Sequence, residues 1–317
     1  MNTLYVVVPC YNEQEVLDET TKRLTEKFNS LIESKAISSD SRIMYVNDGS
    51  KDKTWEMICI FNETNPYVCG VNLSRNRGHQ NALLAGLMTA KEYADIVISM
   101  DADLQDDINA IDEFIGEYNK GNDVVYGVRK RREKDTFFKR FTAEGFYKIM
   151  ILMGVEVVFN HADYRLLSKR ALNALENYQE VNLFLRGIVP LIGFKSSNVY
   201  YNRDERFAGE SKYPLKKMLA FAMEGITSFT IKPIRFITFV GFSVFLISLC
   251  MLVYFLIIHF MGITVQGWTT LVISIWALGG LQLLAIGIVG EYVGKIYMEA
   301  KARPRFIIEK VLMKKDD

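Results

Sequence analysis

The stretch Ile96-Val97-Ile98-Ser99-Met100-Asp101-Ala102-Asp103 decides the fold, because a short apolar run stops there at two carboxylates. Such a run, bounded by polar residues, indicates a buried strand. Leu4–Val8 ends at Pro9 and has the β-branched composition of another buried strand, and Arg42–Val46 and Val68–Leu73 follow the same pattern. Strands that are covered on both faces of a parallel sheet show such continuous apolar runs.

Helical spacing separates these strands. We expect helices over Glu15–Ser34, Thr54–Asn62, Asn81–Tyr93 and Ile108–Lys120, and a fifth strand over Val124–Gly127. Strands that alternate with helices predict an α/β fold with a mostly parallel sheet, covered on both faces. Ligands of such sheets bind beyond the carboxyl ends of the strands. Polar motifs follow Val8, Val46 and Met100, so we expect the functional site at that edge.

The composition limits the function classes. The chain has 317 residues and a net charge of +1, so general nucleic-acid binding is not indicated. The four cysteines show no metal-ligand spacing, and we expect free thiols in a reducing compartment. The first residues lack the basic and apolar pattern of a signal peptide, so we expect the N-terminal domain to stay in the cytoplasm.

Two long apolar segments indicate a membrane anchor. Phe236–Ile258 and Thr269–Val289 each reach the roughly 20 residues that span a bilayer. The linker His259–Trp268 has no Lys or Arg, whereas the outer flanks carry several. The positive-inside rule therefore predicts a two-helix transmembrane hairpin with both flanks in the cytoplasm. The preceding Pro214–Phe229 is amphipathic, and it is either an interfacial helix or a helix that packs on the core.

Asp101 and Asp103 are the leading candidates for metal binding. Two carboxylates two residues apart, just past a strand, are able to share one hard cation through oxygen ligands. Gln105 and the Asp106-Asp107 pair enlarge the polar cluster. A metal held there would bridge the diphosphate of a nucleotide and stabilise charge on the leaving group. The alternative is a solvated acidic turn.

Two other strand ends carry acidic residues. Asp48, in Asn47-Asp48-Gly49-Ser50, is placed to accept hydrogen bonds from a base or ribose, although this sequence is also a common turn. Glu13 follows the first strand, and Tyr11 offers a stacking surface for a base. Three acidic strand ends at one edge are more informative than any of them alone.

Basic and acceptor-side candidates come later in the chain. A basic run begins at Arg129 and extends to Arg140, with aromatic residues interleaved at its end. It is either a solvated loop or a patch against anionic lipid. Arg203, Arg206, Ser211 and Lys212 are placed to hold a phosphate near the membrane. In His161-Ala162-Asp163-Tyr164-Arg165, Asp163 either orients an acceptor, acts as a base, or forms a structural ion pair with Arg165.

In combination, these motifs resemble the family-2 glycosyltransferases of the GT-A fold. The matching stretches are Val6–Glu13 (V-V-V-P-C-Y-N-E), Asn47–Ser50 and Asp101–Asp107 (D-A-D-L-Q-D-D). Leu185-Arg186-Gly187, Gly193-Phe194-Lys195 and Arg206–Tyr213, followed by the apolar hairpin, look like the polyprenyl-phosphate branch. That branch includes the bactoprenol glucosyltransferases and, more distantly, the dolichyl-phosphate mannose synthases.

The resemblance implies a role for each matching position. The residues implied to bind the nucleotide sugar are Pro9, Tyr11, Glu13, Asp48 and Asp101. A site for Mg²⁺ or Mn²⁺ is implied at Asp101, Asp103 and Gln105, and catalytic roles are implied for Asp101, Asp103 and Asp163. The residues implied to bind the lipid phosphate are Arg129, Arg140, Arg206, Ser211 and Lys212. Two positions depart from the family pattern. Asp107 and Ile108 replace the usual Pro-Pro, which bears on the rigidity of the loop, and Ala162 stands where Gly is common before the Asp.

The resemblance also implies an activity and a domain plan. The expected reaction is the inverting transfer of a sugar to undecaprenyl phosphate or another polyprenyl phosphate. The resemblance to this family favours glucose, with UDP-glucose as the donor. The expected domain plan begins with a cytoplasmic GT-A domain (1–212) and an amphipathic helix (213–232). A membrane region (233–296) follows, with transmembrane helices at about 234–259 and 269–292, and the chain ends in a basic cytoplasmic tail (297–317). The expected location is a bacterial inner membrane. Relatives suggest a homotetramer.

Two other functions remain open. A processive polysaccharide synthase is disfavoured because the chain has no Gln-x-x-Arg-Trp motif and a single hairpin. A catalytically silent membrane scaffold that binds sugar nucleotide is disfavoured by the intact acidic set.

Overall fold

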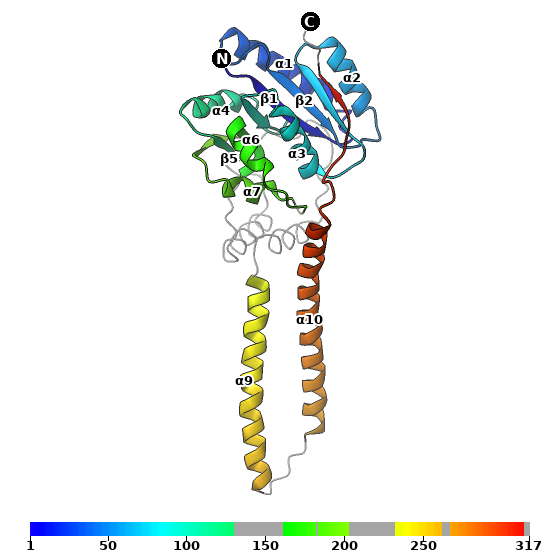
Figure 1. Ribbon diagram of the computed structural model, residues 1–317, viewed down its shortest axis with the longest axis vertical. Coiled ribbons are helices and arrows are strands. Elements are labelled where there is room, and N and C mark those ends of the chain that lie inside the picture. Colours follow the sequence, from blue (N-terminus) through cyan, green and yellow to red (C-terminus); the bar gives the residue numbers. More distant parts are fainter. Residues whose placement is uncertain (130–160, 182, 203–231, 262–266, 314–317) are drawn as a thin grey trace. The chain divides into compact units, whose positions relative to one another are not determined.

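The computed structural model describes residues 1–129, 161–181, 183–202, 232–261 and 267–313. These residues form two compact units. The first contains the sheet, its helices and the last strand of the chain, and the second contains two long helices. Both units are drawn in Figure 1.

The first unit is an eight-stranded mixed sheet with helices between the strands. Its first half runs β1 Leu4–Cys10, α1 Leu17–Glu33, β2 Arg42–Asn47, α2 Thr54–Thr64, β3 Val68–Leu73, α3 His79–Ala90 and β4 Ile96–Ser99. Its second half runs α4 Ala110–Asn119, β5 Val124–Arg129, β6 His161–Ser168, α6 Lys169–Glu176, α7 Leu185–Leu191, β7 Ser196–Tyr201 and β8 Ile308–Leu312. The strand order is β7-β5-β6-β4-β1-β2-β3-β8.

The α/β fold with a mostly parallel sheet is confirmed, and the five predicted strands all form. β1 lies between β2 and β4 and is parallel to both, and β2 is parallel to β3. The prediction did not anticipate β6, which enters between β4 and β5 and runs antiparallel to both. Arg165 of β6 lies opposite Ser99 of β4 and opposite Tyr126 of β5.

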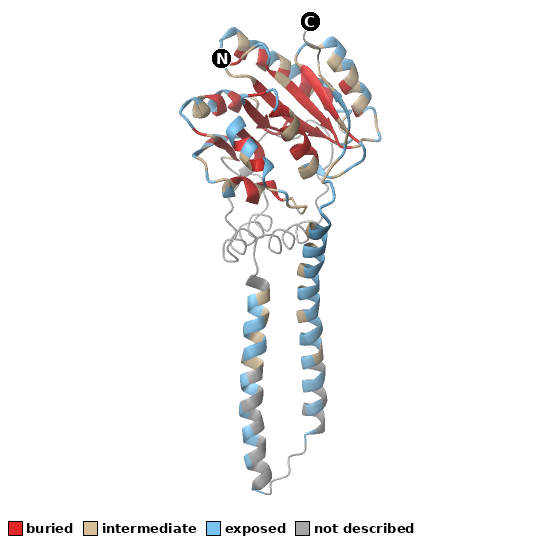
Figure 2. Cartoon of the chain, in the orientation of Figure 1, coloured by how far each residue is buried: buried red, intermediate tan, exposed pale blue. Residues whose placement is uncertain are grey.

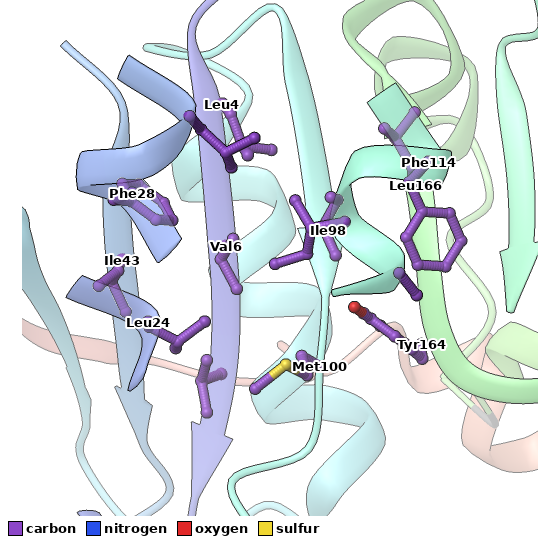
Figure 3. Close-up of a cluster of buried hydrophobic side chains, with 14 of the residues drawn as sticks. Leu4, Val6, Leu24, Phe28, Ile43, Ile98, Met100, Phe114, Tyr164 and Leu166 are labelled. Atoms are coloured by element: carbon purple, nitrogen blue, oxygen red, sulfur yellow. The ribbon is translucent and has the colours of Figure 1, made fainter. Parts of the chain in front are cut away.

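The core fills both faces of the sheet. Every residue of β1 is buried. On one face Val6 packs with Leu24 and Phe28 of α1, in the cluster drawn in Figure 3. On the other face α3 approaches so closely that a Cβ on Gly86 would lie 2.4 Å from Val7 Cγ1. Figure 2 shows the buried residues concentrated in the strands, so the sheet is a rigid support for the loops at its edge.

The second unit holds α9 Lys232–Phe260 and α10 Trp268–Lys301. Within the part of the chain that the structure describes, one helical stretch, Leu278–Lys301, is long and apolar enough to cross a membrane. The segment Ile234–Val244 meets the apolar criterion over a shorter length. The predicted two-helix hairpin is therefore corrected to one long apolar helix, because among the described residues the first predicted span is sufficiently apolar only over the shorter stretch Ile234–Val244. Large apolar side chains such as Leu283 and Ile286 of α10 are exposed, as expected for a helix that meets lipid.

The chain returns to the sheet after α10. β8 pairs with β3 in antiparallel orientation, with Val71 opposite Val311 and Gly70 opposite Leu312. Residues 308–312, predicted as part of a basic tail, therefore add an edge strand to the first unit. The predicted amphipathic helix Pro214–Phe229 lies outside the described residues.

Candidate active site

The carboxyl ends of β1 to β4 lie at one edge of the sheet, because these four strands are parallel. Hydrogen bonds join the loops after β1 and β2. The amide of Asn12 donates to Ser50 Oγ over 3.0 Å, and the amide of Lys51 donates to Asn12 Oδ1 over 2.9 Å. The amide of Glu13 donates to Thr54 Oγ1 over 2.9 Å. These hydrogen bonds make the two loops one connected structure.

Three predicted nucleotide positions differ in exposure. Tyr11 is exposed, as a stacking surface requires. Glu13 is half-buried, and its carbonyl oxygen accepts hydrogen bonds from the amides of Val16 and Leu17. Pro9 lies inside β1, buried opposite Val46. Asn12 adopts a left-handed conformation, with φ of 56°, that is uncommon outside Gly and recurs at functional turns.

The Asp48 carboxylate is held by the loop that follows β3. Its Oδ1 accepts from the amide of Arg77 over 2.6 Å, and its Oδ2 accepts from the amide of Gly78 over 2.9 Å. Burial raises the pKa of Asp48, and these two amide hydrogen bonds oppose that rise. Both oxygens therefore have protein partners, and each keeps a lone pair for a further donor. The predicted contact with a ribose or base stays a prediction.

The loop after β4 carries the predicted metal ligands. It is anchored at its start, where the amide of Met100 donates to the carbonyl of Val7, and Asp103 Oδ1 accepts from the amide of Gln105 over 3.2 Å. Leu104 between them has φ of 56°, which costs about 1–3 kcal/mol for a non-glycine residue. A strained residue between two candidate ligands indicates a loop shaped for a function other than stability.

The charges of this loop fit a cation. Burial raises the pKa of Asp101 and, although His79 opposes the rise, the neighbouring carboxylates of Asp163 and Asp103 add to it. A divalent cation would relieve that crowding. Among the described side chains, no three His, Cys, Asp or Glu residues converge as a complete metal cage. The acidic pair Asp101 and Asp103 instead matches Mg²⁺-type binding, in which one or two carboxylates share the ion with substrate phosphates and water.

Asp163 of β6 is the centre of a charged network. Its carboxylate pairs with Arg165 Nη2 over 2.6 Å and with Arg186 of α7 through two hydrogen bonds of 3.1 and 2.9 Å. Burial alone would raise the pKa of Asp163, but Arg186, the nearby imidazole of His79 and Arg165 outweigh burial and hold the pKa well below its usual range. Asp163 is thus a firmly ionised carboxylate. The structural ion pair with Arg165, one of the open alternatives, is confirmed.

His79 connects this network to the metal loop. At the first position of α3, its Nε2 lies 3.6 Å from Asp101 Oδ1 and 3.7 Å from Asp163 Oδ2. Partial desolvation of the ring lowers the pKa of His79, but the nearby carboxylates of Asp163 and Asp101 outweigh it and raise the pKa overall. One imidazole therefore lies between the proposed donor side and the proposed acceptor side of the site.

A second set of contacts fixes the far end of the metal loop. Asp106 accepts a hydrogen bond of 2.6 Å from the Tyr201 hydroxyl and lies 3.7 Å from Arg129 Nη2. The Tyr164 hydroxyl donates to the carbonyl of Asp107 over 3.0 Å. Burial raises the pKa of Asp106 to about 6, with Asp101 adding to the rise. Arg129, predicted to hold a lipid phosphate, thus contacts the loop of Asp106 in this structure.

The other predicted lipid-phosphate residues lie outside the described residues. They are Arg140, Arg206, Ser211 and Lys212. Their phosphate-binding role stays a prediction.

Sequence reasoning missed His79, Arg77 and Arg186 as individual residues. The loop after the strand Val68–Leu73 was not singled out, although it begins at the same edge of the sheet as the acidic loops. The usable signal was position: any polar residue after a parallel strand of this sheet is a candidate. Arg186 appeared only within a matching stretch, and its partner Asp163 is distant in sequence.

Comparison with known proteins agrees with this geometry. The profile of glycosyl transferase family 2 matches residues 5–175. The chain is 56% identical over 306 residues to the uncharacterized glycosyltransferase YkoT of Bacillus subtilis, covering 96% of this chain and 91% of that protein. It is 37% identical to a prophage bactoprenol glucosyl transferase homolog of Escherichia coli, covering 96% and 98% of the two chains.

A third relative is the bactoprenol glucosyl transferase of Shigella phage SfII, which is 38% identical over 310 residues and covered to 97%. The resemblance seen in the motifs is therefore confirmed, and the similarity extends over nearly the whole length of these proteins. The chain belongs to glycosyl transferase family 2.

Proposed function

We propose that this protein transfers a single sugar, glucose from UDP-glucose in the first instance, to a polyprenyl phosphate with inversion at the anomeric carbon. Full-length relatives named as bactoprenol glucosyl transferases support the donor sugar and the lipid. The observation that carries the proposal is His79, which lies 3.6 Å from Asp101 and 3.7 Å from Asp163. It makes the acidic loop and the Arg-bound carboxylate of β6 parts of one site.

The nucleophile in this reaction is the lipid phosphate, and it needs little help from a base. A phosphate monoester has a second pKa near 6, so most of it is a dianion at neutral pH. Asp163 would be a poor proton acceptor, because its own pKa is held well below the usual range. We therefore assign Asp163 an orienting role. It holds Arg186 and His79 in place, and catalysis comes mainly from positioning and charge.

Asp101, Asp103 and Gln105 would hold Mg²⁺ or Mn²⁺ together with the donor diphosphate. The cation would supply charge stabilisation for the nucleoside diphosphate as it leaves. The carboxylates have a second effect of their own, because they repel the anionic donor unless a cation is present. Donor binding should therefore require the metal.

We also propose that the protein is associated with a bacterial membrane. The support is α10, whose stretch Leu278–Lys301 is long and apolar enough to cross a bilayer. The basic residues near the end of this helix and after it favour a cytoplasmic position for the sheet.

The test is the lipid product. Detergent-purified protein is incubated with undecaprenyl phosphate, Mg²⁺ or Mn²⁺, and a panel of sugar nucleotides, and the lipid fraction is read by mass spectrometry. A lipid that carries one hexose supports the proposal and names the donor. A polymer would favour a processive synthase. Nucleotide binding without any transfer would favour a scaffold.

A further inference from the structure

The segment that follows α10 lies against the loop after β3, at the edge of the sheet where the nucleotide is proposed to bind. We call residues 303–312 the return segment. The guanidinium of Arg77 donates to the carbonyl of Arg305 through Nε over 2.7 Å and to the carbonyl of Pro304 through Nη2. The amide of Ser74 donates to the carbonyl of Ile307 over 3.0 Å. The loop after β3 is therefore bonded to the chain that has just left the long apolar helix.

Further contacts fix the return segment itself. Arg305 Nη2 donates to the carbonyl of Tyr178 over 2.7 Å, and Asn72 Nδ2 donates to Glu309 over 2.8 Å. Asn72 also accepts a hydrogen bond of 2.7 Å from Asn47, which immediately precedes Asp48. The return segment is thus tied to the ends of both β2 and β3.

Arg77 joins this segment to Asp48. Its side chain binds the return segment, while its amide, with that of Gly78, binds the two carboxylate oxygens of Asp48. The two loops also touch through their backbones, since a Cβ on Gly49 would lie 2.5 Å from the amide nitrogen of Asn76. Gly49 and Gly78 both have positive φ, at 63° and 85°. Such a turn has many alternative conformations when nothing else holds it.

We propose that Arg77 is a positioning residue through which the return segment sets the geometry of the nucleotide-binding loops. This inference rests on the proposed function, because it takes the nucleotide to bind beside Asp48. Arg77 acts through the loop and leaves the reacting atoms to other residues. Without the two hydrogen bonds from the Arg77 guanidinium, the loop populates conformations that do not bind nucleotide. The apparent affinity for nucleotide then falls in proportion to the fraction of molecules whose loop is in the binding conformation. A lysine is a point charge, and it does not reproduce a bond to two successive carbonyls.

The experiment measures UDP binding by calorimetry, with full-length protein in detergent and excess Mg²⁺. Arg77→Ala should weaken UDP binding by about tenfold, as expected when most of the loop population becomes incompetent. Arg77→Lys should give an intermediate loss. Arg75→Ala, an exposed arginine in the same loop, is the matched control and should stay within about twofold of the parent. In turnover assays the donor KM should rise with the dissociation constant while kcat stays unchanged, a separation that general destabilisation does not produce.

Arg305→Ala tests the same connection from the other end. It removes the bond to Tyr178 and leaves Arg77 in place, so UDP binding should weaken by a smaller factor. Arg77→Ala protein that binds UDP as tightly as the parent would overturn the inference, and so would a loss confined to kcat. If the parent protein itself binds no UDP in the presence of metal, the proposed function fails along with the inference.

Discussion

Arg186 of α7 donates two parallel hydrogen bonds to Asp163 of β6, from Nε to Oδ1 over 3.1 Å and from Nη2 to Oδ2 over 2.9 Å. This bidentate geometry is the strong form of an Arg–carboxylate pair, and it fixes orientation as well as charge. Asp163 is almost fully buried, whereas Arg186 is partly exposed. The carboxylate is thus shielded from solvent, whereas the guanidinium that holds it is partly accessible.

We predict that Arg186→Lys lowers kcat by about 10- to 100-fold, because a lysine cannot reproduce the two-point contact that aligns the site. The protein should remain folded, since Asp163 keeps Arg165 as a partner. Steady-state kinetics and a thermal melt separate the two effects. Unchanged kcat in a folded Arg186→Lys protein would show that this pair has no part in catalysis.

The Asp163 network predicts a pH dependence of stability. A carboxylate whose folded pKa lies below its unfolded value of about 3.9 stabilises the fold above that pH, and the stabilisation is lost as pH falls through the folded pKa. Burial would raise the pKa of Asp163, but its cationic partners lower it well below the usual range. The unfolding free energy of Asp163→Asn should therefore fall short of the parent by a constant amount between pH 5 and 8, and the gap should narrow below about pH 4.

Urea unfolding at a series of pH values provides this measurement. Both proteins should carry His79→Gln, because His79 contacts Asp163 and titrates in its own right. A gap that stays constant down to about pH 2 would contradict the depressed pKa.

Gly86 and Gly116 predict opposite effects of one substitution. A Cβ on Gly86 would lie 2.4 Å from Val7 Cγ1 and 2.6 Å from Val46 Cγ2, whereas a Cβ on Gly116 of α4 would meet nothing within 4 Å. Gly86→Ala should reduce the unfolding free energy by about 1–3 kcal/mol through overpacking. Gly116→Ala should raise it by up to about 1 kcal/mol through helix propensity. The unfolding free energy of both variants is measured by chemical unfolding. If both substitutions changed it in the same direction, the close packing of α3 on β1 would be contradicted.

Tyr201→Phe should destabilise the protein by about 1–3 kcal/mol, because it removes the hydrogen bond to the buried Asp106 carboxylate. The other oxygen of Asp106 is buried without a hydrogen-bond partner among the described residues, so no second hydrogen bond to this carboxylate compensates for the one that is removed. Tyr200→Phe removes the same hydroxyl from an exposed neighbour and is the matched control. Equal melting temperatures for the two variants would argue against the role of Tyr201 in fixing the metal loop.

The sequence predicted the half of the fold that apolar strands define. β1 to β4 are buried on both faces, so their composition is recognisable without partners, and Asp48 and Asp101 stand out where those strands end. β6 was missed because Asp163 and Arg165 are polar residues in a buried strand, stabilised by each other and by Arg186. β8 was missed because its partner, β3, is remote in sequence. Local patterns do not reveal pairing of that kind, and the same limit hid Arg77 and His79.

The most direct test of the account compares the parent protein with Asp103→Ala in the transfer assay, with undecaprenyl phosphate, metal ion and UDP-glucose. The account predicts a lipid carrying one hexose from the parent, and at least a 100-fold lower rate from a folded Asp103→Ala protein, as expected when charge stabilisation of the leaving group is lost. Near-normal transfer by Asp103→Ala with saturating metal would contradict it.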